Sequence, residues 1–219
     1  MVNTYIVVGS RGIVGSQILT RLNTVGKHVL IKTTHEILHS SEAELYDSIS
    51  ASMAEYSVCL SEANIGLILA HRYRGNDIRS ALDNERCISR DFVWGLTKLV
   101  TSLRVVVIGS IAGRRIDRKQ SEAYHYSKDL QKSIVRQSVR IDKLHMNLLE
   151  LNWFEKYPKS QAFDEYKQTL DRVKRHLGGD NLPNVDSITD FACSLIEMAH
   201  PPRGQEILYD GGFSMFLTE

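Results

Sequence analysis

The chain has 219 residues, 42% of them hydrophobic and 24% charged, and its formal net charge is +1. Such a chain has no strong field to attract nucleic acid or an anionic membrane, so neither is expected as a partner. No apolar segment approaches the length that spans a bilayer, and the N-terminus shows no basic leader or cleavage site. The three cysteines are scattered without metal-ligand spacing, so no metal site is expected. We therefore expect a single cytoplasmic domain over residues 1–219.

Short apolar runs alternate with longer segments of helical periodicity. In chain order, the predicted elements are a strand at 5–8, a helix at 13–22, a strand at 29–31, a helix at 42–56, a strand at 65–69, a long helix at 78–99, a strand at 105–108, a helix at 124–141, a strand at 146–151, helices at 164–176 and 188–198, and a strand at 206–209. Strands that are apolar on both faces and separated by helices indicate a parallel sheet covered on both sides. The fold class is therefore α/β, a doubly wound sheet of six or seven strands.

Three glycines follow the first predicted strand in a G-x-x-G-x-x-G pattern. A turn that lets the backbone approach a pyrophosphate needs residues without a Cβ atom, and the next helix offers free N–H groups and a positive dipole end. The pattern therefore predicts a dinucleotide-binding turn, although a tight strand–helix turn without a ligand has the same pattern. The candidate cofactor-binding residues of this turn are Gly9, Ser10, Arg11, Gly12, Ile13 and Gly15.

The end of the second strand bears on the choice of cofactor. An acidic residue there would bind a ribose 2′-hydroxyl, and a basic residue would suit a 2′-phosphate. The chain has no carboxylate there before Glu36, and Arg11 lies inside the glycine turn. We therefore favour NADP(H) over NAD(H), with solvated surface charge as the simpler interpretation of these residues. The further candidate cofactor-binding residues are Lys32, Thr33 and Thr34.

Tyr124 and Lys128 are four residues apart on a predicted helix and so share one face. A phenol titrates near pH ~10 in water, and a nearby ammonium favours the phenolate and lowers that value. The pair could exchange a proton with an alcohol or carbonyl while a cofactor exchanges hydride. Ser110 ends a predicted strand, where side chains line the ligand crevice of such sheets, and its hydroxyl could polarise the same substrate oxygen.

Four motifs follow one another along nearly the whole chain. They are Gly9-Ser10-Arg11-Gly12-Ile13-Val14-Gly15, Gly109-Ser110-Ile111-Ala112-Gly113, Tyr124-His125-Tyr126-Ser127-Lys128 and Arg203-Gly204-Gln205-Glu206-Ile207-Leu208-Tyr209-Asp210-Gly211-Gly212. In their order and separation the chain resembles the short-chain dehydrogenases/reductases. The resemblance implies a Rossmann fold and an NAD(P)(H)-dependent oxidoreductase that interconverts a small-molecule carbonyl and a secondary alcohol.

The same resemblance implies a role for each matched residue. Tyr124 matches the general acid/base of the family, and Lys128 matches the residue that lowers the tyrosine pKa and binds the nicotinamide ribose. Ser110 matches the residue that hydrogen-bonds the reacting oxygen. Members of the family usually form homodimers or homotetramers through their long helices, including the helix that carries the tyrosine.

Other positions depart from the family pattern. The usual Asn-Asn-Ala-Gly after the fourth strand is replaced by a segment that begins with Ala70 and His71, which we keep as candidate cofactor contacts. This segment is basic: His71, Arg72 and Arg74 could bind a phosphate or an acidic substrate, or form a solvated loop. The relay asparagine of the family falls at Ser89, with Asn84 nearby.

Two regions differ in length or composition. Too few residues precede Ile65 for a helix–strand–helix, so the third strand shrinks to Ile37–Leu38 or a helix is missing. The Pro-Gly expected after the sixth strand is absent, and an aromatic-rich segment over about 153–184 is the expected cover of the substrate site. The candidate substrate-binding residues are Ser110, Ile111, Tyr124 and Trp153.

Two alternatives remain from the sequence. The glycine spacing and the basic segment favour a sugar-nucleotide reductase or epimerase, although the C-terminal part is small for that branch. The altered ribose-side motif favours a non-catalytic dinucleotide-sensing scaffold. The intact Ser110, Tyr124 and Lys128 argue against a scaffold, which has no need for a phenol beside an ammonium.

Overall fold

The computed structural model of the chain describes residues 2, 4–110, 121–151 and 183–209. The helix expected at 164–176, the two candidate residues Ile111 and Trp153, and nearly all of the expected substrate cover lie outside these ranges.

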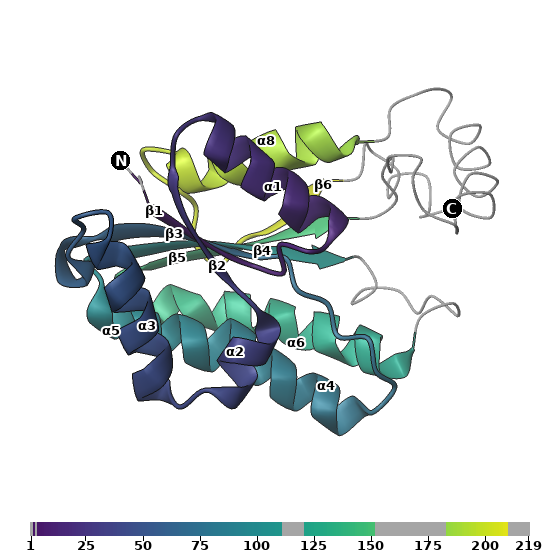
Figure 1. Cartoon of the computed structure of the whole chain (residues 1–219). Helices are drawn as coiled ribbons and strands as arrows, with labels where there is room; N and C mark the ends of the chain where they lie inside the picture. Colours follow the sequence, from purple (N-terminus) through teal and green to yellow (C-terminus); the bar gives the residue numbers. More distant parts are fainter. Residues whose placement is uncertain (1, 3, 111–120, 152–182, 210–219) are drawn as a thin grey trace.

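Six strands form one parallel sheet in the order β2-β1-β3-β4-β5-β6, which confirms the predicted α/β class (Figure 1). The strands are β1 (Thr4–Val8), β2 (His28–Lys32), β3 (Asn64–Leu69), β4 (Ser102–Ser110), β5 (Leu144–Leu151) and β6 (Glu206–Tyr209). Because β1 pairs with β2 on one side and β3 on the other, the strand order reverses at β1. In open parallel sheets the ligand crevice lies outside the carboxyl ends of the strands at such a reversal.

Helices cover both faces of the sheet. They are α1 (Ile13–Thr24), α2 (Thr34–His39), α3 (Glu42–Ala54), α4 (Ile78–Glu85), α5 (Val93–Leu99), α6 (Glu122–Gln137) and α8 (Val185–Glu197). Figure 1 shows α1 and α8 on one face and α2 to α6 on the other. None of the helices in the described ranges is long and apolar enough to cross a lipid bilayer.

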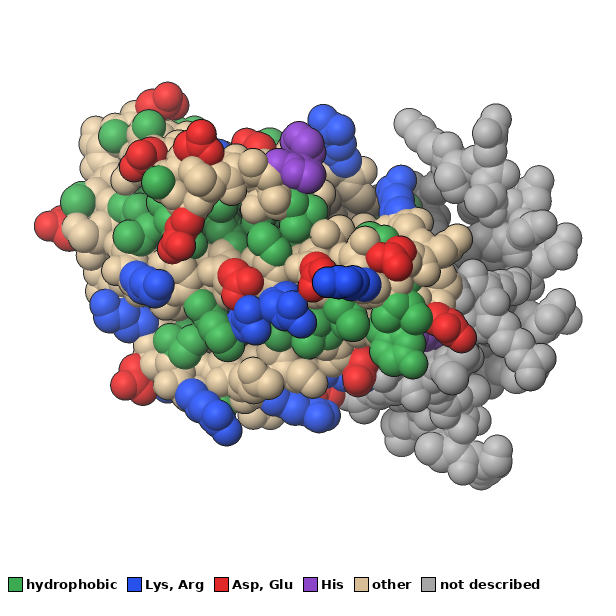
Figure 2. Space-filling model, turned by 90° about the horizontal axis from the view of Figure 1, so that it is seen from below, with side chains coloured by type: hydrophobic (Ala, Val, Ile, Leu, Met, Phe, Trp, Pro, Cys, Tyr) green, Lys and Arg blue, Asp and Glu red, His purple; other side chains and the backbone are tan. Residues whose placement is uncertain are grey.

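Alternation along each strand divides the core into two clusters. On β1, Ile6 and Val8 join the cluster beneath α2 to α6, whereas Tyr5 and Val7 join the cluster beneath α1 and α8. The face of α2 to α6 carries positive and negative side chains interspersed with hydrophobic ones (Figure 2). This mixture agrees with the nearly neutral charge of the chain.

The region after β2 agrees with neither of the two alternatives that the sequence left open, because two helices, α2 and α3, lie between β2 and β3 with no strand between them in this described part of the chain. The expectation of a strand at Ile37–Leu38 is wrong, because these residues belong to helix α2. Thr33 caps this helix: its hydroxyl accepts a bond from the Glu36 amide at 3.1 Å, and the Glu36 carboxylate accepts one from the Thr33 amide at 2.6 Å. This reciprocal capping box fixes a helix start directly after β2. Strand β2 is therefore an edge of the described sheet.

The long helix expected at 78–99 is present but is not uniform. Helix α4 leads into a π-helical segment, η2 (Arg86–Phe92), and then into α5. Such π turns widen a helix locally and are frequent at functional sites. Ser89 is in this segment and is fully buried.

A buried ion pair lies between α6 and β5. The Nζ atom of Lys132 is 3.0 Å from Oε1 of Glu150, and the two side chains are 6% and 0% exposed. A buried charge that loses its partner keeps its desolvation cost without compensation. Removing either charge of this pair is therefore expected to be costly.

We predict that Lys132→Met lowers the free energy of unfolding by about 3–5 kcal/mol, because it removes the ammonium that lies 3.0 Å from the buried Glu150 carboxylate. The double variant Lys132→Met/Glu150→Leu should lose less free energy of unfolding than the single variant Lys132→Met. Urea denaturation measures both. Arg136→Met is the control, because Arg136 pairs with Glu206 while its own side chain is 67% exposed. This variant should lower the free energy of unfolding by less than about 1 kcal/mol. A double variant less stable than Lys132→Met would contradict this account.

Candidate active site

The glycine turn packs directly against the backbone that follows β3. Gly9 has a φ of +85°, and a Cβ atom there would lie 2.6 Å from the carbonyl carbon of Ala70 and 2.8 Å from the nitrogen of His71. The Ala70 amide also donates to the Val8 carbonyl at 2.8 Å. Glycine is therefore required at position 9 by both conformation and space.

Helix α1 starts tightly against the same turn. A Cβ atom at Gly15 would lie 2.3 Å from the Gly9 carbonyl oxygen. Gly12 is the N-cap, no side chain caps it, and the first turn of the helix holds no acidic residue. The positive end of the helix dipole therefore has no compensating carboxylate from its own first turn, which suits an anionic ligand. Among the other candidates of the turn, Arg11 and Ile13 are exposed and Ser10 is half-buried.

The candidates at the end of β2 are placed differently from one another. The Lys32 ammonium is buried, donates to the Ser48 hydroxyl at 2.8 Å and lies 3.5 Å from Glu36. Lys32 therefore ties β2 to α3 through an internal contact. Thr33 caps α2, and Thr34 lines a pocket at the carboxyl edge of the sheet.

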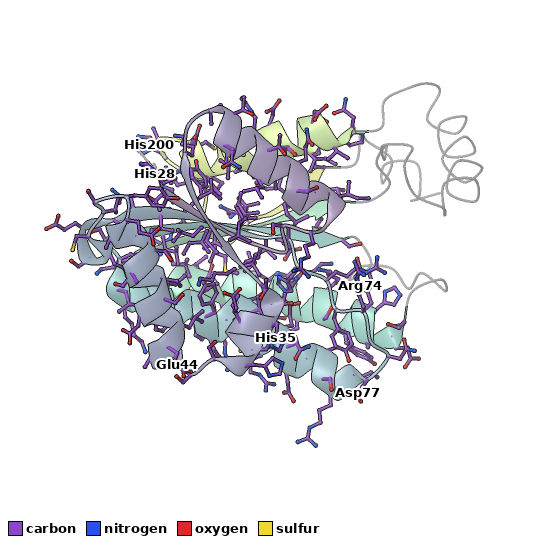
Figure 3. The ribbon with its side chains drawn as sticks, in the orientation of Figure 1. His28, His35, Glu44, Arg74, Asp77 and His200 are labelled. Atoms are coloured by element: carbon purple, nitrogen blue, oxygen red, sulfur yellow. The ribbon has the colours of Figure 1, made fainter. Side chains whose placement is uncertain are left out.

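This pocket has a volume of about 350 Å³. It lies between α2, the loop after β3 and α4, and its lining residues are Thr34, Leu38, His71, Arg72, Tyr73, Arg74, Asn84, Glu85 and Ile88. Figure 3 shows Arg74 at the carboxyl-end side of the sheet, above the start of α4 that Asp77 marks. The pocket thus joins His71, a candidate from the sequence, to two arginines and a buried carboxylate.

The tyrosine and lysine are on the first two turns of α6, which begins on the side of the sheet where the strands have their carboxyl ends (Figure 1). The Ser121 hydroxyl accepts a bond from the Tyr124 amide at 3.3 Å and so fixes the start of the helix. Lys128 Nζ is 5.7 Å from the centre of the Tyr124 ring, and the Arg72 guanidinium carbon is 4.7 Å from it. Two cations therefore lie beside the ring of the phenol.

Lys128 is buried, and its ammonium donates to Oε1 of Gln131 at 2.9 Å. Ser110 is the last residue of β4, where it pairs with Leu151 of β5. The structure therefore brings the glycine turn, the loop after β3 and the Tyr124–Lys128 pair together in one chain of contacts. Ser110 lies at the carboxyl end of its strand, the same edge of the sheet.

A buried carboxylate that the sequence analysis missed lies inside this site. Glu85 is 2% exposed, and its two oxygens are 3.1 and 3.2 Å from Nε2 of His71. The Ser89 hydroxyl donates to the same carboxylate. Asn84, the other residue considered for the relay, lines the pocket instead. A glutamate on a polar helix is normally exposed, so only its spacing of four from Ser89 could have indicated a shared inner face.

We predict that Gly9→Ala destabilises the protein more than Gly26→Ala does. Both glycines have positive φ, +85° and +70°, but a Cβ atom at Gly26 meets nothing within 4 Å. Gly26→Ala should cost about 1–2 kcal/mol for the left-handed backbone alone. Gly9→Ala should cost more, because its Cβ atom would also collide with the backbone of Ala70 and His71. Thermal or urea unfolding of the two variants measures the difference in stability. If both variants lost the same free energy of unfolding, the stability of the turn would not depend on this close contact.

No family model and no curated protein sequence matches this chain. Solved structures do match it over nearly its whole length. A short-chain type dehydrogenase/reductase from Mycobacterium ulcerans has a TM-score of 0.68 at 14% identity, covering 97% of this chain and 90% of the other. A short chain dehydrogenase from Burkholderia cenocepacia J2315 in complex with NADP has a TM-score of 0.66 at 10% identity, with coverages of 96% and 97%.

The 3-alpha-hydroxysteroid dehydrogenase from Pseudomonas sp. B-0831, complexed with NADH, has a TM-score of 0.64 at 15% identity and covers 98% of each chain. The TM-scores of all three structures indicate the same fold as this chain. The resemblance seen in the sequence motifs thus extends to the fold, over nearly the whole length of the chain. This chain has the fold of the short-chain dehydrogenases/reductases.

Proposed function

We propose that this protein is a divergent short-chain dehydrogenase/reductase that interconverts a carbonyl and a secondary alcohol with a nicotinamide cofactor. One observation carries the proposal: Tyr124 and Lys128 are one turn apart on α6, and the ring of Tyr124 meets the loop that packs on the glycine turn. A proton-transferring pair and a candidate dinucleotide turn are thus parts of one site.

The residues present fit such a cofactor. At Gly9 and Gly15 the backbone leaves no space for a side chain, and the uncapped start of α1 suits the pyrophosphate. When bound, the cofactor supplies or accepts a hydride at the substrate carbon. In the reducing direction, the hydroxyl of Tyr124 gives its proton to the substrate oxygen, and Ser110 donates a hydrogen bond to that oxygen. The Lys128 ammonium lies beside the phenol and would contact the nicotinamide ribose.

We propose that NADP(H) is the preferred form of the cofactor. The proposal is based on the positive charge of the pocket and not on Lys32, whose ammonium is bound inside the protein. Arg72 and Arg74 line the pocket, and Arg11 is exposed in the glycine turn. Guanidinium groups bind phosphate through paired N–H donors. A 2′-phosphate in this region would be compensated by them. The solved relatives bind either form, with NADP in the Burkholderia structure and NADH in the Pseudomonas structure.

We also propose that the protein acts in the cytoplasm as a homodimer or homotetramer through its long helices. Tyr126 on α6 is 52% exposed, and the face of α2 to α6 shows hydrophobic side chains at its surface (Figure 2). An aromatic side chain at this degree of exposure suits a contact between copies of the chain. The chemical class of the substrate is a small carbonyl compound or its alcohol.

We predict that Tyr124→Phe lowers kcat by about 100-fold or more, because it removes a general acid/base. The measurement is NADPH consumption with a carbonyl substrate found by screening aldehydes and ketones against the unaltered protein. NADPH affinity should change little. Tyr126→Phe, two residues further on the same helix and exposed, should retain full activity. Unchanged turnover by Tyr124→Phe would overturn the assignment.

We predict that Arg74→Ala raises the Kd for NADPH by about tenfold or more and leaves the Kd for NADH nearly unchanged, since a charge-assisted contact to phosphate is lost. Calorimetric titration with NADPH and with NADH measures the two Kd values and so the ratio between them. Arg79→Ala is the control, because the Arg79 side chain is 92% exposed on α4 and lies outside the pocket lining. If the affinities for NADPH and NADH fell by the same factor, Arg74 would not be the residue that recognises the 2′-phosphate.

A further inference from the structure

The Glu85 carboxylate is an unusual group to find in the interior, and its surroundings come from three separate elements. His71 approaches from the loop after β3, Ser89 from the π-helical segment, and Lys128 from α6. Burial raises the pKa of Glu85, but His71, Lys128 and Ser89 together outweigh burial and lower the pKa below its usual range. Glu85 is therefore ionised at neutral pH and acts as a fixed negative charge.

This charge dictates which nitrogen of His71 carries a proton. An ionised carboxylate can only accept hydrogen bonds, so the Nε2 atom that faces both Glu85 oxygens at 3.1 and 3.2 Å must be the donor. In the neutral ring, Nδ1 is then left as an acceptor. The position of the proton follows from the partner, as for many functional histidines.

The Nδ1 atom of His71 is buried and has no hydrogen-bond partner among the described residues. The whole side chain is 6% exposed, yet His71 lines the pocket at the carboxyl edge of the sheet. Buried polar atoms in native proteins are nearly always paired, so an orphaned one in a residue that lines a pocket is a candidate partner for a ligand atom. With the ring neutral, a matching ligand atom is a donor, such as a hydroxyl or an amino group.

We propose that Glu85 is a positioning residue of the cofactor site. It holds His71 with Nε2 protonated, so that Nδ1 accepts a hydrogen bond from a ribose hydroxyl or the adenine amino group of the bound dinucleotide. The charge of Lys128 on α6 also lowers the pKa of this carboxylate, so the two groups are electrostatically coupled. This inference rests on the proposed function, because it needs a dinucleotide in the pocket, and it assigns a role to a residue outside the family motifs.

Glu85→Gln tests the proposal, because it keeps the shape of the side chain and removes its charge. We expect the Kd for NADPH to rise about tenfold, because an amide can either donate or accept and no longer fixes the ring. Nitrogen-15 NMR of the cofactor-free protein provides the second readout. Of the eight histidines, the signals of His71 are identified by their loss in His71→Phe. They should show the Nε2-protonated form in the unaltered protein and a mixture in Glu85→Gln.

Asp83→Asn is the matched control on the same helix. Its carboxylate is 55% exposed and bonded to Arg86, so neither the NADPH affinity nor the His71 signals should change. If Glu85→Gln does not fold, His71→Phe keeps the test open, because it removes both ring nitrogens and should weaken NADPH binding by a similar factor. Unaltered binding by His71→Phe would overturn the inference.

The two proposals fail in different ways. If the unaltered protein binds neither NADPH nor NADH, the proposed function fails, whatever the NMR signals of His71 show. If it binds NADPH and Glu85→Gln binds it equally well with unchanged His71 signals, the role of Glu85 fails while the proposed function stands. A change in both readouts, absent in Asp83→Asn, supports the inference.

Discussion

The close contact between the glycine turn and the backbone after β3 is the constraint on which the site depends. Gly9 leaves no space for a Cβ atom against Ala70 and His71, so these two segments cannot move independently. The loop that continues from this contact carries Arg72 to the ring of Tyr124 and His71 to the Glu85 carboxylate. One contact between two strand ends thus links the candidate dinucleotide turn to the candidate pair Tyr124 and Lys128.

Buried charge is the second organising feature, and it lies on the α6 side of the sheet. Lys128 and Lys132 are one turn apart on that helix, and both are buried. Lys132 pairs with Glu150 of β5, while Lys128 lies close enough to Glu85 to lower the pKa of its carboxyl. Such pairs add little net stability, but breaking one is costly, so they restrict how α6 can lie on the sheet. Such a restriction would suit the proposed role of Tyr124 on this helix.

Most elements of the fold could be predicted because each rests on local information. An apolar run such as Val105–Ile108 has to be buried on both faces, and helical periodicity marks the segments between such runs. The segment Ile37–Leu38 was ambiguous, since a pair of apolar residues is too short to distinguish strand from helix. The capping box between Thr33 and Glu36 resolves it in favour of a helix, and β2 consequently becomes an edge of the described sheet.

The sequence by itself determined the class of the sheet, the position of the glycine turn and the candidate pair Tyr124 and Lys128, because these depend on residue type and short spacing. Only the tertiary structure decided which charges face one another. Lys32 pairs with Ser48 and Glu36 inside the protein, and Glu85 lies buried between His71, Ser89 and Lys128. The physical reason is that burial and pairing depend on packing between elements distant in sequence, and a polar residue type alone predicts exposure.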